Sequence, residues 1–151
     1  MIFYWKYENY TYIEHLAIDT NLRGKNYGSK ILKAFCEESK NTILEIDNPV
    51  DEISIKRLNF YTKLGFKLQK FNHVHPPYRK EYERHNLKVA SKGVKIDKII
   101  YKKFSKDYRI YPNSFTCNCF KLPDETIVMA TDIGFHLSAL SSMLINDTKN
   151  G

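Results

Sequence analysis

The order of β-rich and helix-periodic runs in residues 11–46 constrains the fold more than any other feature of the sequence. The runs TYIEHLAI (11–18) and TILEI (42–46) are rich in residues that favour strands. Between them, at about 27–39, apolar residues recur at the spacing of one helix face: Ile31, Leu32, Phe35 and Cys36. A strand, a helix and a strand in this order predict a β-α-β unit with parallel, right-handedly connected strands.

Shorter patterns extend this unit in both directions. Residues 2–5 are a β-rich run that a polar segment separates from the next run, which predicts a hairpin. Asp51 is a candidate N-cap for a helix that ends at Gly65, a residue type that commonly terminates helices. Further strands are expected at 66–71 and 87–91. A last helix is expected around apolar residues at helical spacing: Ile96, Ile99, Ile100 and Phe104.

The composition indicates one globular domain in a reducing compartment. The chain has 151 residues, of which 42% are hydrophobic. No run approaches the roughly 18 consecutive apolar residues of a membrane span. The 3 cysteines make no even disulfide framework, so we expect a cytoplasmic protein without a membrane partner. The net charge of +7 favours anionic ligands, which include nucleic acid, phosphorylated cofactors and acidic substrates.

A short basic loop, NLRGKNYGSKIL (21–32), opens directly into the predicted helix. Unpaired N–H groups at a helix start favour anions, and Gly24 and Gly28 let the backbone approach a ligand closely. With the charges of Arg23 and Lys25, the loop is suited to phosphate. It matches neither the nucleotide P-loop nor the dinucleotide G-x-G-x-x-G pattern, so an ordinary basic turn is the alternative.

Two blocks of the sequence resemble the GNAT family of acyl-CoA-dependent N-acetyltransferases. In the block EHLAIDTNLRGKNYGSKIL, Arg23–Gly28 resembles the family's pyrophosphate loop, Arg/Gln-x-x-Gly-x-Gly/Ala. In the block RLNFYTKLGF, Tyr61–Phe66 resembles the end of a family helix, Tyr-x-x-x-Gly-Phe. The resemblance implies a GNAT-like α+β fold: a central mixed β-sheet flanked by helices, with a β-α-β core that binds acetyl-CoA.

The resemblance covers about residues 1–108, which are expected to form a GNAT-like core without the family's usual first strand and first two helices. Residues 109–151 have no counterpart and are expected to be a C-terminal extension. Two positions depart from the family pattern: Asn26 replaces the first glycine of the loop, and Ser54 stands where asparagine is common. Asparagine tolerates left-handed backbone better than most residues, so the loop is expected to keep its turn.

The resemblance also implies acetyl-CoA as a co-substrate and places the residues that bind it. Backbone groups of Leu16, Ala17 and Ile18 are expected to pair with the pantetheine arm, as an added strand would. A simple buried strand is the alternative for these three residues. The pyrophosphate is expected at the residues of the loop: Arg23, Gly24, Lys25, Asn26, Tyr27, Gly28 and Ser29.

Two side chains are expected to carry the chemistry. The resemblance implies that Tyr61 is the general acid that protonates the departing CoA thiolate; its spacing from Leu58 alone would indicate a core tyrosine. Glu14 lies two residues before Leu16, on the same face of an extended strand, and can accept the amine's proton directly or through water. A solvent-facing carboxylate is the alternative for Glu14.

The histidines indicate no metal site. His73 and His75 alternate on an expected strand end, but no third ligand has convincing spacing. His15 points away from Glu14 on its strand and is expected to be structural. By analogy with the family, Tyr78 and Arg79 are expected to line the acceptor site.

The predicted function is transfer of an acetyl group from acetyl-CoA to a primary amine. The amine attacks directly in a ternary complex of the protein with its two partners, acetyl-CoA and the amine. One alternative is a truncated, non-catalytic relative that binds CoA or a partner chain. The other is a nucleic-acid-binding module that uses interleaved aromatic and basic residues such as Tyr101 and Lys102, although no known nucleic-acid motif is present. The sequence leaves open whether the chain forms a homodimer and which amine accepts the acetyl group.

Overall fold

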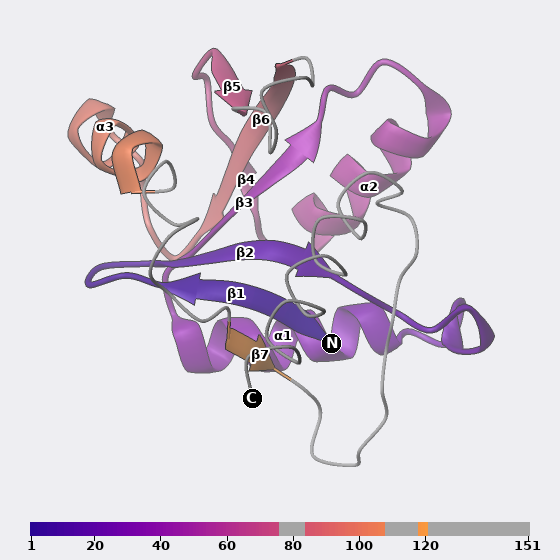
Figure 1. Cartoon of the computed structure of the whole chain (residues 1–151). Helices are drawn as coiled ribbons and strands as arrows, with labels where there is room; N and C mark the ends of the chain where they lie inside the picture. The colour runs from indigo at the N-terminus through magenta and orange to yellow at the C-terminus, as the bar shows by residue number, and fades with distance from the viewer. Residues whose placement is uncertain (76–83, 108–117, 121–151) are drawn as a thin grey trace, which may run out of the picture.

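The computed structural model describes residues 1–75, 84–107 and 118–120. The described strands are β1 (Ile2–Lys6), β2 (Thr11–Leu16), β3 (Thr42–Asp47), β4 (Lys67–Leu68), β5 (His73–His75), β6 (His85–Lys92) and β7 (Asn118–Phe120). The described helices are α1 (Tyr27–Ser39), α2 (Glu52–Lys63), α3 (Lys98–Asp107) and the short 3-10 helix η1 (Thr20–Leu22). These strands form one 7-stranded sheet in the order β4-β6-β3-β2-β1-β7, with β5 also paired to β6 (Figure 1).

The predicted α+β architecture is confirmed. β1 and β2 form the expected antiparallel hairpin, in which the Tyr7 N–H donates to the Tyr10 carbonyl at 2.9 Å. β2 and β3, which precede and follow α1 in the sequence, pair in parallel with each other and so form the predicted β-α-β unit. All other strand pairs are antiparallel among the described residues, so the sheet is mixed.

The strand expected at 66–71 is shorter than predicted, because β4 spans only Lys67–Leu68. The Gln69 N–H still donates to the Val89 carbonyl of β6 at 2.8 Å, and pairing with β6 resumes at β5, where His73 lies opposite Leu87. Between these two paired segments, the Phe71 ring stacks on Tyr101 of α3 with 4.2 Å between the ring centroids. The predicted strand is therefore interrupted where Phe71 packs on α3, and the same edge of β6 is paired again by β5.

Some sequence predictions fall outside the described residues. Tyr78 and Arg79 lie outside them, and so does most of the predicted extension at 109–151. Within that stretch β7 is described, and it pairs antiparallel with β1 at the edge of the sheet.

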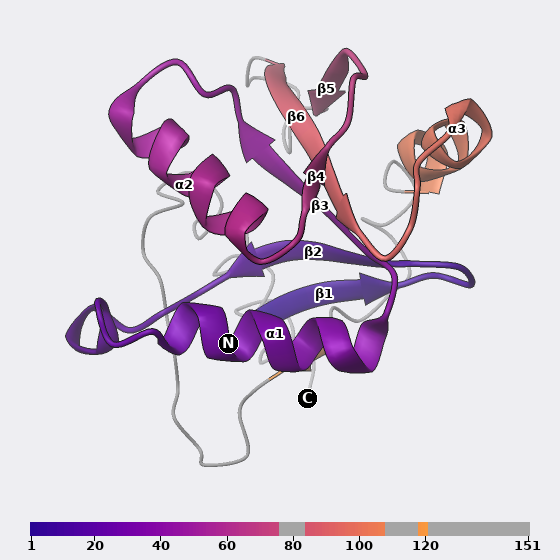
Figure 2. The same ribbon diagram turned by 180° about the vertical axis from the view of Figure 1, so that it is seen from behind.

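Side chains alternate between two apolar clusters on opposite faces of the sheet, as strand geometry requires. On one face, the aligned residues Ile13, Leu44 and Ala90 pack with the apolar stripe of α1 and with residues of α2. Both helices lie on the side nearer the viewer in Figure 2. On the other face, Tyr12 and its neighbours pack with Phe104 of α3. Burial of each large apolar side chain contributes about 1.5–3 kcal/mol, so the helices are held firmly against the sheet.

The two parallel strands diverge in the middle of the sheet. Their pairing runs from Thr11 with Thr42 to Ile13 with Leu44, although both strands continue for three more residues (Figure 1). The end of each strand instead remains paired with the strand on its other side. Leu16 of β2 is opposite Ile2 of β1, and Asp47 of β3 is opposite Leu87 of β6. The sheet therefore opens between the carboxyl ends of β2 and β3.

The start of α1 confirms the prediction for Asn26. This residue is the N-cap and adopts a left-handed conformation with φ of 60°, and its side chain makes no capping hydrogen bond. Few residues other than glycine adopt this conformation readily, but asparagine does. The replacement of glycine by asparagine in the loop thus preserves the turn that begins the helix.

Both ends of α2 also follow local sequence signals. The Asp51 carboxylate accepts from the Ser54 N–H at 2.8 Å, and the Ser54 hydroxyl accepts from the Asp51 N–H at 3.1 Å, which completes a capping box. At the other end, Gly65 has φ of 90°, and the Phe66 N–H donates to the Tyr61 carbonyl at 3.1 Å. This glycine-terminated ending fixes the last turn of α2, which carries Tyr61.

Candidate functional site

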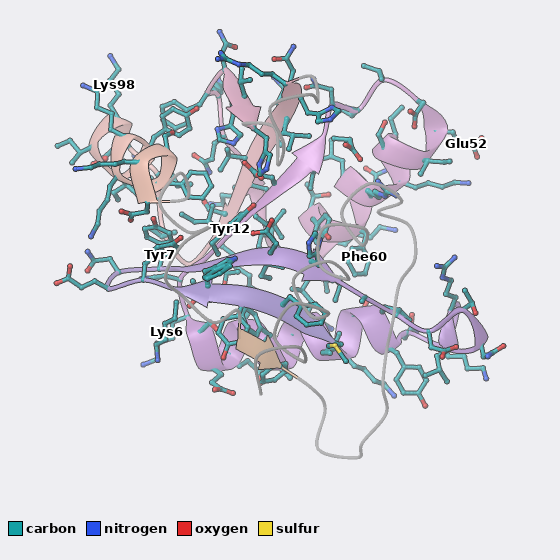
Figure 3. All side chains as sticks on the ribbon, viewed as in Figure 1. Lys6, Tyr7, Tyr12, Glu52, Phe60 and Lys98 are labelled. Carbon is teal, nitrogen blue, oxygen red and sulfur yellow. The ribbon has the colours of Figure 1, made fainter. Side chains whose placement is uncertain are left out.

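A cavity of about 550 Å³ lies where β2 and β3 diverge. Its walls come from these strand ends, the loop and first turn of α1, α2 and β5; Figure 3 shows two lining residues, Tyr12 on β2 and Phe60 on α2. Tyr12 belongs to the face of the sheet that α3 covers, whereas Phe60 packs on the opposite face. Because both faces contribute, two ligands can approach each other through the opening between the strands.

The structure brings most of the predicted cofactor residues and both predicted catalytic residues onto this cavity. Among the described residues, the predicted ones that line it are Glu14, Leu16, Ile18, Arg23, Gly24, Asn26, Tyr27, Gly28, Ser29 and Tyr61. Ala17 and Lys25 are not among the lining residues.

The backbone at the end of β2 explains why Ala17 is set apart from its neighbours. The Ala17 N–H donates to the Met1 carbonyl at 2.8 Å, and the Met1 amine donates to the Ala17 carbonyl at 2.9 Å. Successive backbone groups of an extended chain point in opposite directions. The N–H and C=O groups of Leu16 and Ile18 therefore point away from β1, towards the side on which β3 has diverged.

The first turn of α1 presents backbone donors to the cavity. The first intrahelical bond is donated by the Lys30 N–H to the Asn26 carbonyl at 3.0 Å, so the N–H groups of Tyr27, Gly28 and Ser29 precede the helical ladder. No acidic residue occupies this turn, and the N-cap side chain does not bond to it. The helix start, with Arg23 beside it on the cavity wall, is thus suited to an anion.

Gly28 packs closely against the end of the Ile18 side chain. A Cβ atom on Gly28 would lie 2.7 Å from the Ile18 Cδ1 atom and 3.5 Å from the Phe60 ring. A larger side chain would therefore push into the cavity wall between the end of β2 and α2. The absence of a side chain brings the helix start close to the strand end.

Tyr61 lies in the last turn of α2 with its ring held by other aromatic rings. It packs edge-on against Phe60 and Phe66, with 5.2 and 5.7 Å between ring centroids. Burial raises the pKa of Tyr61 to about 12, although the nearby Arg57 guanidinium opposes the shift. The phenol therefore keeps its proton at neutral pH, as a proton donor must.

Glu14 is half-buried on β2 and is not a purely solvent-facing carboxylate. Its Oε2 atom accepts a hydrogen bond from the Trp5 indole N–H at 3.0 Å. Trp5 is on β1, opposite Tyr12 of β2, so its indole approaches Glu14 from the neighbouring strand. This contact fixes the carboxylate in the cavity wall.

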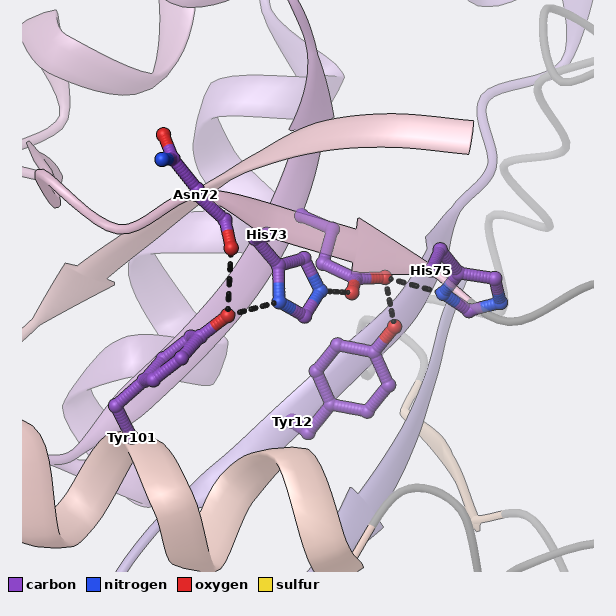
Figure 4. A network of polar contacts seen from close by, with 6 residues as sticks. Tyr12, Asn72, His73, His75 and Tyr101 are labelled. Atoms are coloured by element: carbon purple, nitrogen blue, oxygen red, sulfur yellow. Dashed lines mark hydrogen bonds and ion pairs between the residues drawn. The ribbon is translucent and has the colours of Figure 1, made fainter. Parts of the chain in front are cut away.

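A buried polar network beside Glu14 is the main feature that the sequence analysis missed. The Glu45 carboxylate on β3 accepts from the Tyr12 hydroxyl at 2.7 Å and contacts His75 Nδ1 at 2.9 Å and His73 Nε2 (Figure 4). His73 Nδ1 in turn contacts the Tyr101 hydroxyl of α3 at 3.0 Å. The alternation of His73 and His75 in the sequence indicated that both side chains lie on one face of a strand. The sequence did not reveal their shared partner, Glu45, which is 28 and 30 positions away in a run with the pattern of an ordinary strand.

The network keeps Glu45 ionised in the protein interior. Only 7% of its side chain is exposed, and burial alone would raise its pKa. The hydrogen bonds from His73 and His75 outweigh burial and lower the Glu45 pKa to about 2. For His75, burial alone would lower the pKa, but the hydrogen bond and charge of Glu45 and the charge of Glu14 raise it above its ordinary value.

Three further observations define the surroundings of the cavity. Arg57 of α2 lines the wall and donates to the Asp47 carboxylate at 2.7 Å, which ties the helix to the end of β3. Within the described ranges, no group of three acidic, histidine or cysteine side chains is arranged to hold a metal ion. No described helix is both long enough and apolar enough to cross a membrane.

Comparisons with known proteins agree with this geometry. Residues 1–68 match the family model for the acetyltransferase (GNAT) domain. The structure is similar to that of a protein from Bacteroides thetaiotaomicron assigned to the GNAT family of acetyltransferases, with a TM-score of 0.69 and 29% sequence identity. The matched region covers 73% of this chain and 63% of the length of the Bacteroides protein. No curated protein matches the sequence significantly.

Proposed function

We propose that this chain, whose residues 1–68 match the family model for the acetyltransferase (GNAT) domain, transfers an acetyl group from acetyl-CoA to a primary amine. The observation that carries the proposal is the cavity through the opening between β2 and β3. A helix start suited to phosphate lies at one part of its wall, and candidate acid and base groups lie at another. A ternary complex needs this combination, because the cofactor and the amine must meet within one site.

Acetyl-CoA would lie along the wall formed by β2 and α1. The backbone groups of Leu16 and Ile18 that point towards the opening would pair with the amide groups of the pantetheine arm. The N–H groups of Gly28 and its neighbours, with Arg23, would hold the pyrophosphate. The thioester would then be placed in the opening between the diverging strands.

The reaction needs one proton acceptor and one proton donor. An amine nitrogen attacks the thioester carbon, and a backbone N–H near Leu16 stabilises the oxyanion by roughly 3 kcal/mol. Glu14 accepts a proton from the amine, directly or through water. The C–S bond then breaks, and Tyr61 gives its proton to the CoA thiolate. The proton that Glu14 accepted then passes, through water, to the Tyr61 phenolate. Because the amine attacks the thioester directly, no covalent enzyme intermediate forms.

CoA binding tests the cofactor half of the proposal. We expect CoA at a hundredfold excess over its dissociation constant to stabilise the protein against unfolding by about 2.7 kcal/mol. Gly28→Asp should abolish this stabilisation, because the new side chain occupies the wall beside Ile18 and adds a negative charge where the phosphates bind. Differential scanning fluorimetry with and without CoA measures both effects.

Two controls separate the causes. Gly28→Val introduces the steric conflict without the charge, and we expect it to weaken the CoA effect less than Gly28→Asp. Lys33→Ala, on an exposed position of the same helix, should leave the effect intact. If millimolar CoA fails to shift the parent protein, or if Gly28→Asp responds like the parent, the assignment of this site to CoA is wrong.

A further inference from the structure

We propose that Arg57, held by Asp47, acts on the reaction through Tyr61: its positive charge stabilises the phenolate that Tyr61 becomes when it gives its proton to the CoA thiolate. The inference rests on the proposed acetyl transfer and adds a residue to which the sequence analysis assigned no role. Arg57 is a positioning residue in this scheme, because it acts through the proposed acid.

Helix geometry places Arg57 beside Tyr61. The two residues are four positions apart on α2, so their side chains lie on the same face of the helix. Both line the cavity, as does Asp47 at the end of β3. The Arg57 Nη1 atom donates to the Asp47 Oδ2 atom at 2.7 Å, and 34% of the Arg57 side chain is exposed. The ion pair thus holds the guanidinium on the wall that carries the proposed acid.

The proposed proton transfer is uphill unless the phenolate is stabilised. Burial raises the pKa of Tyr61 to about 12. An alkyl thiol such as the cysteine side chain has a pKa of about 8.5, so a thiolate is a weaker base than the phenolate that Tyr61 becomes. A cation close to the phenolate lowers the free energy of forming it, and the effect is larger in a poorly solvated site than in water.

Charged groups act on the Tyr61 hydroxyl from two elements. After burial, which raises the Tyr61 pKa, the largest influence is Arg57 of the same helix, which lowers it, followed by Asp47 of β3, which raises it. The ion pair therefore does not cancel at Tyr61 and leaves a net positive influence there. The neighbouring pair of Lys56 and Glu52 differs, because its side chains are 72% and 81% exposed and water screens their charges.

The proton balance of the reaction is unchanged by this role. Tyr61 loses its proton to sulfur as the C–S bond breaks, and the phenolate persists beside Arg57 until the proton accepted by Glu14 reaches it through water. Arg57 keeps its own proton, because a guanidinium does not titrate in proteins. The phenolate forms during the reaction and not in the bound ground state, so the effect belongs to kcat and not to CoA binding.

Two variants of the same ion pair separate this role from a structural one. Arg57→Gln removes the cation, so kcat should fall about tenfold, the effect of one pKa unit, while the thermal shift caused by CoA persists. Asp47→Asn breaks the same ion pair but removes the charge that opposes proton donation, so kcat should rise roughly twofold. If both variants lower kcat to the same extent, or if Arg57→Gln turns over at the parent rate, the role assigned to Arg57 is wrong.

Further variants serve as controls for the charge. Arg57→Lys keeps the cation, and we expect it to retain most of the parent kcat. Lys63→Gln removes a positive charge from an exposed position of the same helix that is not among the described residues lining the cavity. It should turn over at the parent rate. A loss in Lys63→Gln equal to that in Arg57→Gln would show that the position of the charge does not matter and would contradict the proposal.

A second measurement needs no acceptor amine. ¹³C NMR of the protein alone, labelled at tyrosine Cζ, follows the ionisation of Tyr61, whose signal is identified by its loss in Tyr61→Phe. Compared with the parent, ionisation should begin at higher pH in Arg57→Gln and at lower pH in Asp47→Asn. Identical titration in all three proteins would overturn the proposal whether or not turnover is found. The expected order in a protein that acetylates no amine would support the action of Arg57 on Tyr61 and contradict acetyl transfer, so the two failures are distinguishable.

Discussion

Replacing Tyr61 by phenylalanine is expected to lower the rate of acetyl transfer by about 10²–10⁴-fold and to leave CoA binding unchanged. The ring contacts with Phe60 and Phe66 persist in the variant, so only the hydroxyl group is lost. Proton donation to the leaving thiolate stabilises the transition state and not the bound ground state, so the effect should appear in kcat. Steady-state kinetics, combined with the thermal shift caused by CoA, measures both quantities.

The pKa of Tyr61 adds a prediction about pH. The acid form is the active one, and burial raises its pKa to about 12. Deprotonation of Tyr61 should therefore not reduce kcat until the pH approaches that value. A loss of activity at a lower alkaline pH would have to come from another group.

Tyr4→Phe is a matched control for Tyr61→Phe. Tyr4 packs edge-on against Phe35 with 4.9 Å between ring centroids, and it is not among the described residues that line the cavity. We expect its variant to turn over at the parent rate. If Tyr61→Phe also turns over at the parent rate with a working amine, Tyr61 is a core residue and the proposed acid is wrong. If the loss appears only in the binding constant, the residue positions the cofactor.

Replacing Glu45 by alanine is expected to destabilise the protein by about 3–5 kcal/mol, which is a large fraction of the stability of a domain of this size. The carboxylate accepts hydrogen bonds from Tyr12 and is paired with two buried histidines, whose side chains are 1% and 6% exposed. Removing it leaves these polar groups buried without their partner. Urea unfolding followed by circular dichroism measures the change in the free energy of unfolding.

The control for this variant is an acidic residue of the same type on the surface. Glu38→Ala, at an exposed position of α1, should change the free energy of unfolding by no more than about 0.5 kcal/mol. Glu45→Gln keeps the size and one acceptor oxygen, so we expect it to be less destabilising than Glu45→Ala. Equal effects of Glu45→Ala and Glu38→Ala would show that the network does not contribute to stability.

The same network predicts how stability depends on pH. The Glu45 pKa is lowered from 4.5 to about 2 in the folded protein, so its contribution is present above pH 4.5 and is lost as the pH falls towards 2. The His75 pKa is raised above 6.5, so its contribution is present below pH 6.5 and is lost as the pH rises through the raised value. Glu45→Ala should therefore weaken the dependence of the free energy of unfolding on pH, both below pH 4.5 and above pH 6.5.

The sequence by itself determined the elements that depend on neighbouring residues. The apolar spacing within 27–39 defines α1, because a helix buries one face at a period that is visible in any short window. Asp51 and Gly65 set the ends of α2 through contacts within a few residues. The left-handed turn at Asn26 is likewise a local property, and so the loop that we propose binds phosphate could be located before the fold was known.

The opening between β2 and β3 was decided by the tertiary structure. The runs 11–18 and 42–46 read as strands along their whole length, and neither contains a signal for where their pairing stops. Pairing stops because the end of β2 stays with β1 and the end of β3 stays with β6. The same competition for backbone hydrogen bonds joins Ala17 to Met1 and so sets it apart from Leu16 and Ile18.

The Glu45 network also depended on tertiary structure alone. Its contacts to His73 and His75 join residues that are 28 and 30 positions apart in the chain. A buried carboxylate must find hydrogen-bond donors, but the sequence does not state which donors will reach it. The pairing of β5 with β6, and of β6 with β3, supplies them. Local patterns therefore located the proposed cofactor loop, whereas the polar centre of the cavity required the register of strands that are distant in sequence.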